Sequence, residues 1–298
     1  MTAVRYNLGF VAFNNSKDVR AMILLLDEWS PPGLNRCMMV DHSTETAPRE
    51  VNQKMANEKG WEYEALPNKG FGAGVNRLAS MSKDQEVLVV LNLDVFFREA
   101  PPFQMMAEAV LRGGFSWVGT SILNESGERV AGRLPALNLR VLSYNYQRDL
   151  DEHGEKAISW EDAALWDGAV HGGCFAVRVS DFNDVGGIDE SLFLYAEEFD
   201  LFAKFKKAQR LTGFLVSSAI VHSSEGSFDS EKHLLARYNL RYLARRERKW
   251  MLWIALSLLL CRDIVRITGR VKMKPLLFSN LSRPALLIEM FPRQSSVA

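Results

Sequence analysis

The hydrophobic and polar positions of the first half of the chain follow two alternating periods. Residues 8–13, 36–40, 61–66 and 86–91 are short apolar runs that predict strands, and residues 17–29, 48–59 and 74–81 carry apolar side chains at helical spacing. We expect Ser16 to cap the first helix and Gly60 to end the second. Strands and helices that follow one another in this way predict an open, mostly parallel α/β sheet flanked by helices.

The pattern is less regular in the second half. Helices are predicted at residues 101–112 and 199–209, strands at 115–122, 172–179 and 214–222, a turn at 124–127, and a long connection at 133–154. From residue 228 onward the chain has a helical and basic character. The predicted architecture is therefore an α/β unit followed by a helical C-terminal extension.

Composition narrows the class of protein. The 298 residues are 47% hydrophobic, which allows a sizeable core, and the formal net charge of zero argues against a nucleic-acid-binding protein. Three widely spaced cysteines give no zinc-binding pattern and fit a reducing compartment. The N-terminal residues lack the charged start and apolar run of a secretory signal, so a cytoplasmic location is expected.

Four polar residues end or follow predicted strands: Asp41, Asn92, Asp94 and His222. Ligands of parallel α/β sheets bind at the carboxyl ends of strands, so these residues predict a site at that edge. Strand alternation puts Asn92 and Asp94 on one face, where a carboxylate can bind a hard divalent cation. The alternative is that Asp94 caps a turn. A lone histidine is more often structural, although imidazole is an acceptable ligand for Mn²⁺-like ions.

Two further segments carry candidate chemistry. The stretch NKGFGAGVN, residues 68–76, has glycines that permit close approach to a phosphate, but a tight strand-to-helix turn explains them equally well. Glu197, Glu198 and Asp200 lie together beside an aromatic run. A partly desolvated carboxylate among them can act as a general base, whereas acids at a helix N-terminus are also favoured by the helix dipole.

The order of these segments resembles a known family. MMVDHST, NKGFGAGVNRL, VLVVLNLDV, GGIDESLFLYAEEFDLFAKF and VHSSEGS follow one another along the chain. Over about residues 5–245 this order resembles the family-2 inverting glycosyltransferases of GT-A fold, a Rossmann-like architecture, and in particular their bacterial rhamnosyltransferase-like branch. The resemblance implies a nucleotide-sugar donor, with dTDP-rhamnose favoured and UDP-sugars open, a Mg²⁺ or Mn²⁺ cofactor, and a saccharide or lipid-linked acceptor.

The resemblance also implies roles for individual residues. The residues that would contact the donor are Asp41, Asn68, Gly70, Gly72, Asn76, Asn92 and Asp94. Asp94 would hold the metal ion on the diphosphate, and His222 would complete its shell. Glu198 stands where the family usually has an aspartate base, and Glu197 is the fallback for that role. Leu93 and Asn92 are further departures, because the family motif has proline and aspartate there.

The C-terminal segment carries the charge asymmetry of the chain. Residues 237–274 hold eleven Lys and Arg and two acids, a net +9, so the remainder sums to −9. The apolar run Trp250–Cys261 would span about 18 Å as a helix, too short for a bilayer core of about 30 Å. It predicts peripheral membrane docking, an oligomer interface, or packing on the catalytic domain. We expect a catalytic domain over residues 1–230 and a basic helical region over 231–298.

The sequence therefore predicts a metal-dependent inverting glycosyltransferase of bacterial surface polysaccharide synthesis. Two alternatives remain open. One is a non-catalytic nucleotide-sugar-binding protein on the same fold, in which Glu198 marks lost activity. The other is a nucleotidyltransferase, although that class needs a basic glycine-rich loop near the N-terminus, which residues 7–20 do not supply.

Overall fold

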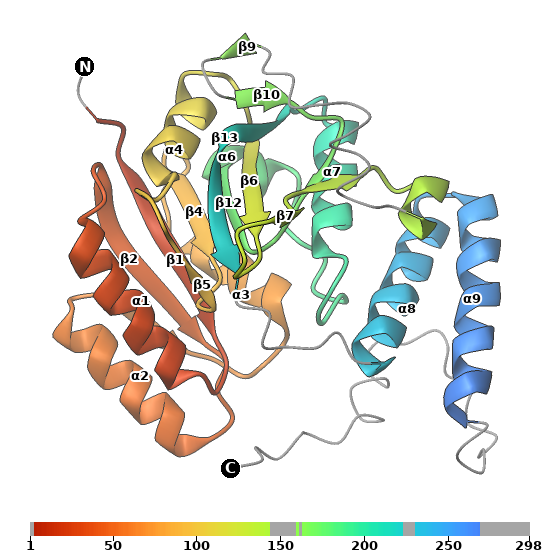
Figure 1. The fold of residues 1–298 in the computed structure, drawn as a ribbon, viewed down its shortest axis with the longest axis horizontal. Helices are drawn as coiled ribbons and strands as arrows, with labels where there is room; N and C mark the ends of the chain where they lie inside the picture. The colour runs from red at the N-terminus through yellow and green to blue at the C-terminus, as the bar shows by residue number, and fades with distance from the viewer. Residues whose placement is uncertain (1–2, 144–158, 161–162, 223–229, 269–298) are drawn as a thin grey trace.

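A computed structural model describes residues 3–143, 159–160, 163–222 and 230–268 (Figure 1). The strands are β1 (Tyr6–Ala12), β2 (Leu34–Asp41), β3 (Glu62–Ala65), β4 (Val87–Leu91), β5 (Val95–Phe96), β6 (Trp117–Leu123), β7 (Arg129–Ala131), β8 (Arg133–Pro135), β9 (Ser159–Trp160), β10 (Ala163–Leu165), β11 (Gly168–Val170), β12 (Cys174–Arg178) and β13 (Thr212–His222). The helices are α1 (Ser16–Trp29), α2 (Thr46–Glu58), α3 (Phe71–Ser80), α4 (Phe103–Leu111), α6 (Val179–Asp184), α7 (Glu197–Lys207), α8 (Ser230–Arg246) and α9 (Trp250–Thr268), with a 3₁₀ turn η1 (Leu139–Leu142).

The main sheet confirms the predicted topology. Its strand order is β3-β2-β1-β4-β12-β6-β13-β10-β9, with β5 added to β13 and β7 added to β6. β3, β2, β1, β4, β6 and β13 all run in one direction, and β12 runs against β4 and β6 between them. The carboxyl ends of β1, β2, β4 and β13 therefore share one edge, where ligands of such sheets bind.

Helices cover both faces of this sheet. α1 and α4 pack on one face with the side chains of Val87, Val89 and Leu91, while α3, α6 and α7 pack on the other with Leu88 and Val90. Successive residues of a strand point to opposite faces, so β4 is buried on both sides. Burial on both faces explains why the run VLVVL contains no polar residue.

Most predicted elements are present, with shifted ends. Ser16 is the first residue of α1 and Asn15 is its N-cap, so the predicted cap was wrong by one residue. α3 begins at Phe71, three residues before the predicted start, because Gly70 adopts φ = +97° and makes the turn itself. The predicted connection 133–154 contains β8 and η1 in its described part, and residues 144–154 lie outside the described residues.

The helical C-terminal region packs onto the α/β unit. α8 lies between α7 and α9 (Figure 1), and a third apolar cluster joins Leu243 of α8 and Leu256 of α9 to Leu192 and Ala196, which precede α7. No helix in the described part of the chain has both the length and the apolar character needed to cross a membrane. The boundary at residue 230 stays a prediction.

Candidate active site

The candidate active site forms where β12 begins beside the end of β4. Cys174 pairs with Leu91, and the N–H of Asn92 donates to the carbonyl of Gly173 at 2.9 Å. Because β12 is antiparallel, the residues that precede it lie at the carboxyl edge of the parallel strands. This arrangement places the segment 171–173 next to the predicted Asn92–Asp94 motif.

Asp94 and His222 lie side by side at this edge. β5 pairs with the end of β13, so that His222 stands opposite Val95, and its Nε2 is 3.4 Å from Oδ2 of Asp94. The side chain of His222 is 28% exposed and that of Asp94 is 45% exposed. A carboxylate oxygen and an imidazole nitrogen at this separation suit Mg²⁺ or Mn²⁺. Within the described residues no group of three or more His, Cys, Asp or Glu could hold a metal ion, so the metal role of Asp94 and His222 stays a prediction.

His171 is a site residue that the sequence reasoning missed. Its ring lies 6.3 Å, centroid to centroid, from that of His222, and its Nδ1 accepts the N–H of Gly173 at 3.0 Å. Burial and the neighbouring His222 lower the pKa of His171 to about 4, against the opposing effect of Asp94. The ring is therefore neutral at physiological pH, and its proton is on Nε2.

The two candidate bases have different surroundings. Oε1 of Glu198 accepts the N–H of Gly172 at 3.0 Å, which links Glu198 to the same strand edge as His171. Burial raises the pKa of Glu198 above its ordinary value. Glu197 is 4% exposed, and its Oε1 has no hydrogen-bond partner in the described structure. Burial and then the charge of Glu198 raise the pKa of Glu197 well above the usual 4.5.

A strained loop leads into these acids. Tyr195 and Ala196 have φ values of +70° and +75°, the left-handed region that non-glycine residues avoid. Asn239 of α8 is fully buried and donates through Nδ2 to the carbonyls of Leu194 at 2.8 Å and Tyr195 at 3.0 Å. α8 therefore holds the backbone that aims Glu197 and Glu198.

Arg246, the last residue of α8, fixes the same loop by charge. Its Nη1 is 2.9 Å from Oδ2 of Asp189, and its Nη2 is 2.5 Å from Oδ1 of the fully buried Asp200. Asp200 also accepts the N–H of Asp189 at 2.7 Å and lies 3.0 Å from Nζ of Lys204. Burial acts to lower the pKa of Arg246, but Asp200, Glu247 and their hydrogen bonds outweigh it and raise the pKa. Asp200 is thus a structural carboxylate.

The glycine-rich segment, residues 68–76, packs closely against other parts of the chain. Oδ1 of Asn68 accepts the N–H of Gly70 at 3.0 Å. A Cβ on Gly70 would lie 1.9 Å from the carbonyl oxygen of Phe193, and one on Gly72 would lie 2.5 Å from the side chain of Ile188. The amide of Asn76 both donates to and accepts from the main chain of Ile188, at 2.9 Å each. These contacts favour the tight-turn interpretation, and donor binding by these residues stays a prediction.

Asp41 is also occupied by protein partners. It is fully buried at the end of β2. Its Oδ1 accepts the N–H of Ser43 at 2.7 Å, and its Oδ2 accepts from Asn52 and Tyr63, both at 3.0 Å. The carboxylate therefore stabilises the end of β2, and the contact of Asp41 with the donor stays a prediction.

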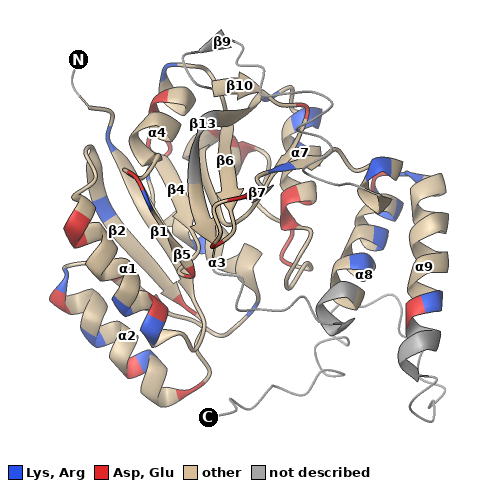
Figure 2. Ribbon diagram, in the orientation of Figure 1, with Lys and Arg blue, Asp and Glu red and all other residues tan. Residues whose placement is uncertain are grey.

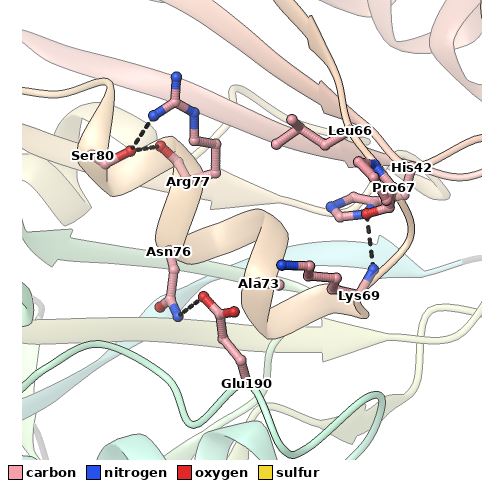
Figure 3. A pocket seen from close by; sticks show the side chains of 9 residues that line it. All are labelled: His42, Leu66, Pro67, Lys69, Ala73, Asn76, Arg77, Ser80 and Glu190. Carbon is pink, nitrogen blue, oxygen red and sulfur yellow. Dashed lines mark hydrogen bonds between the residues drawn. The ribbon is translucent and has the colours of Figure 1, made fainter.

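A pocket of about 390 Å³ lies over the outer side of α3 (Figure 3). Lys69 and Arg77 line it with Glu190, which faces Asn76 in the close view. Of the residues predicted to bind the donor, Asn76 lines this pocket, whereas Asp94 does not. Glu198, the predicted base, does not line it either. The pocket and the strand-edge site are lined by different residues.

Known structures share this fold. The chain aligns with the mannosyltransferase PcManGT from Pyrobaculum calidifontis, in complex with GDP-Man and Mn²⁺, at a TM-score of 0.60 and 10% identity, covering 97% of this chain and 79% of that one. It aligns with GalNAc-T7, with UDP, GalNAc and Mn²⁺, at 0.55 and 14%, covering 74% and 43%. The predicted fold class, that of GT-A glycosyltransferases, is confirmed.

A curated relative agrees with the motif resemblance. The chain is 29% identical over 143 residues to the N-acetylglucosaminyl-diphospho-decaprenol L-rhamnosyltransferase of Mycobacterium tuberculosis, covering 43% of this chain and 44% of that protein. The match thus spans less than half the length of the relative. No protein-family model matches the sequence. The resemblance to rhamnosyltransferase-like proteins is confirmed, the structural neighbours show the fold alone, and the partial match to this relative agrees with the prediction of a glycosyltransferase enzyme.

Proposed function

We propose that this protein is a metal-dependent inverting glycosyltransferase that uses Glu198 as its base. The observation that supports this most directly is the position of Glu198. Its carboxylate reaches the N–H of Gly172 at the strand edge that also carries Asp94 and His222. A Cβ on Gly172 would lie 2.9 Å from Oε1 of Glu198, so glycine makes room for this approach.

The chemistry follows from the charge on the two glutamates. Burial of Glu197 next to Glu198 favours the protonated form of Glu197, which leaves the negative charge on Glu198. Glu198 accepts the proton of the acceptor hydroxyl as that oxygen attacks the anomeric carbon. A raised pKa makes the carboxylate a better proton acceptor near neutral pH. One displacement without an enzyme nucleophile inverts the anomeric configuration.

Asp94 and His222 are the residues that would hold Mg²⁺ or Mn²⁺. Such an ion would neutralise the charge that develops on the leaving nucleoside diphosphate. Asn92 lies in the same segment as Asp94, and the neutral His171 offers an N–H donor beside them. Asp41, Asn68, Gly70, Gly72 and Asn76 would support the donor site indirectly, through the strand end and the α3 turn that they hold.

The donor and the acceptor are proposed from the motif resemblance and from the name of the curated relative. The motif resemblance favours dTDP-rhamnose and leaves UDP-sugars open. The name of the curated relative describes rhamnose transfer to a sugar on a diphosphate-linked polyprenol. We therefore propose a saccharide acceptor, with a lipid-linked diphosphate sugar as the favoured form.

The test compares turnover in matched variants. A donor that stabilises the protein would first be chosen from a panel of nucleotide sugars by thermal shift. Donor turnover with Mg²⁺ or Mn²⁺ is then measured for wild type, Glu198→Gln and Asp94→Asn, with the neighbouring Glu197→Gln as control. We expect a loss of about 10²–10⁴-fold in Glu198→Gln and near-normal turnover in Glu197→Gln. Equal turnover in all four proteins, or the reverse order of the two glutamates, would contradict the assignment.

A further inference from the structure

α9 turns an unusual amount of apolar surface toward solvent. Leu252, Leu256 and Leu260 are buried on its inner side. On its outer side four large apolar residues are exposed: Trp250 (56%), Met251 (73%), Ile254 (52%) and Leu258 (68%). Residues 250, 254 and 258 are four apart and form one stripe along the helix. We call these four side chains the outer stripe.

Other exposed apolar and basic residues lie next to α9. η1 packs against α9 and exposes Leu139 (47%) and Leu142 (37%). Just before Trp250 the chain exposes Arg245, Arg248 and Lys249, whose side chains make no ion pair with the described residues. Figure 2 shows the basic residues at the turn between α8 and α9. By contrast, Arg237 and Arg246 are engaged by Asp263 and Asp200.

We propose that the outer stripe and these three cations dock the protein on a bilayer that contains anionic phospholipids. An amphipathic helix with large apolar residues on one side and unpaired Lys and Arg beside them binds at the membrane interface. Tryptophan at the end of such a helix suits the headgroup level. Anionic headgroups supply the negative partners that Arg245, Arg248 and Lys249 do not have in the described structure.

Two other partners could cover the outer stripe: a second copy of this protein, or residues 269–298 of the same chain. Charge favours the anionic bilayer over both of them. Within its described residues, a second copy of this face would offer the three cations no unpaired acid, because Asp263 of α9 is engaged by Arg237 and Arg262. Residues 269–298 carry Arg270, Lys272, Lys274, Arg283 and Arg293 against the single acid Glu289. That segment therefore adds positive charge and does not neutralise the three cations.

Membrane docking rests on the proposed function in one respect: docking would bring the candidate active site to a lipid-linked acceptor. Docking itself is measured without any sugar. Deleting α9 is a poor test, because it would uncover Leu243 and the cluster that supports the acid-bearing loop. Point substitutions on the exposed side avoid this damage.

The experiment measures co-sedimentation of the full-length protein with vesicles of phosphatidylcholine alone or mixed with phosphatidylglycerol. We expect binding to the anionic vesicles, lost in the Ile254→Glu, Leu258→Glu protein. Replacing Arg245, Arg248 and Lys249 by Gln should weaken partitioning about a hundredfold, or about fivefold for each cation. Leu24→Glu is the matched control, because Leu24 is 63% exposed on α1 at the other side of the molecule (Figure 1).

Wild-type protein that fails to bind the anionic vesicles overturns the proposal, and so does each of three further outcomes. The first is vesicle binding that survives in the Ile254→Glu, Leu258→Glu protein, and the second is an equal loss in Leu24→Glu. The third is a wild-type dimer, seen by light scattering, that the stripe variants convert to monomer. Donor hydrolysis should stay unchanged in all stripe variants. A protein that hydrolyses donor but ignores vesicles refutes docking alone, and one that binds vesicles without turnover refutes the proposed function alone.

Discussion

Glu197 and Glu198 are adjacent in the chain, yet only one of them reaches the strand edge. Glu198 is half-buried and accepts the N–H of Gly172, whereas Glu197 is 4% exposed beneath α3, close to Gly72. A buried carboxyl with an unpartnered oxygen is costly to ionise. The first acid therefore affects stability, and the second is placed for chemistry.

The buried position of Glu197 predicts that Glu197→Gln stabilises the protein at neutral and higher pH. Because the folded-state pKa is raised, the stability due to this group is complete below the ordinary value of about 4.5 and is lost as pH rises through the folded pKa. The gain is about 1.4 kcal/mol for every unit by which the pKa is raised. Chemical denaturation at pH 4 and at pH 8 measures it.

A control for this substitution lies on the same loop. Glu190 is exposed, so Glu190→Gln should change the free energy of unfolding by less than about 0.5 kcal/mol at either pH. A Glu197→Gln protein that is less stable than wild type at pH 8 would show that the carboxylate has a stabilising partner.

At the scale of elements, α3 shows how a glycine-rich segment can serve packing. Gly70 has φ = +97° and ψ = 170°, a conformation essentially restricted to glycine. Its closeness to Phe193 lets the N–H of Phe71 donate to the Phe193 carbonyl at 3.1 Å. The start of α3 is thus joined directly to the loop that carries the acids.

This contact predicts that Gly70→Ala destabilises the protein far more than Gly60→Ala. Both glycines have positive φ, but a Cβ on Gly60 meets no atom within 4 Å, whereas one on Gly70 would overlap the Phe193 backbone. Gly60→Ala should cost about 1–2 kcal/mol through backbone conformation alone. Gly70→Ala should cost clearly more, as measured by urea denaturation. Equal costs would mean that the acid-bearing loop moves aside freely.

The same scale shows what the sequence can predict. Apolar periodicity locates the central strands and most helices, because burial on one or both faces dictates that pattern. It also brings Asp94 and His222 to one edge, since both follow parallel strands. It gives no signal for His171, which precedes a strand. Only the antiparallel direction of β12, decided by pairing with β4 and β6, brings that residue to the site.

Long-range partners are equally hidden in the sequence. Asn239 and Arg246 lie in a segment whose pattern predicts a basic helix. Their contacts with residues 189–200 depend on how α8 packs against that loop. The sequence predicts Asp200 as one acid of a cluster, but not that it is an ion-pair partner rather than a base. Tertiary contacts between segments over forty residues apart decide that difference.

At the scale of the whole molecule, α8 connects the C-terminal region to the catalytic loop. Among the described residues, Arg246→Ala leaves the fully buried Asp200 with Lys204 and the Asp189 N–H, and it should lower the free energy of unfolding by about 3 kcal/mol. Arg246→Lys keeps a charge but cannot bridge both carboxylates, so an intermediate loss is expected. Urea denaturation measures both variants.

The exposed neighbour Arg245 provides the control, because Arg245→Ala should change stability by less than about 0.5 kcal/mol. Donor turnover should fall in Arg246→Ala under conditions where the protein is still folded, since the loop that aims Glu198 loses its anchor. Full turnover in a folded Arg246→Ala protein would show that the loop holds its shape without α8.

The position of Arg246 late in the chain also has a consequence for biosynthesis. Every residue assigned to the site, up to His222, leaves the ribosome before the helix that carries Asn239 and Arg246. The loop with Tyr195 and Ala196 in left-handed conformations therefore has to wait for partners made more than forty residues later. A chain that ends before Arg246 would contain every residue assigned to the site. It would still lack the contacts of Arg246 that hold the acid-bearing loop in place.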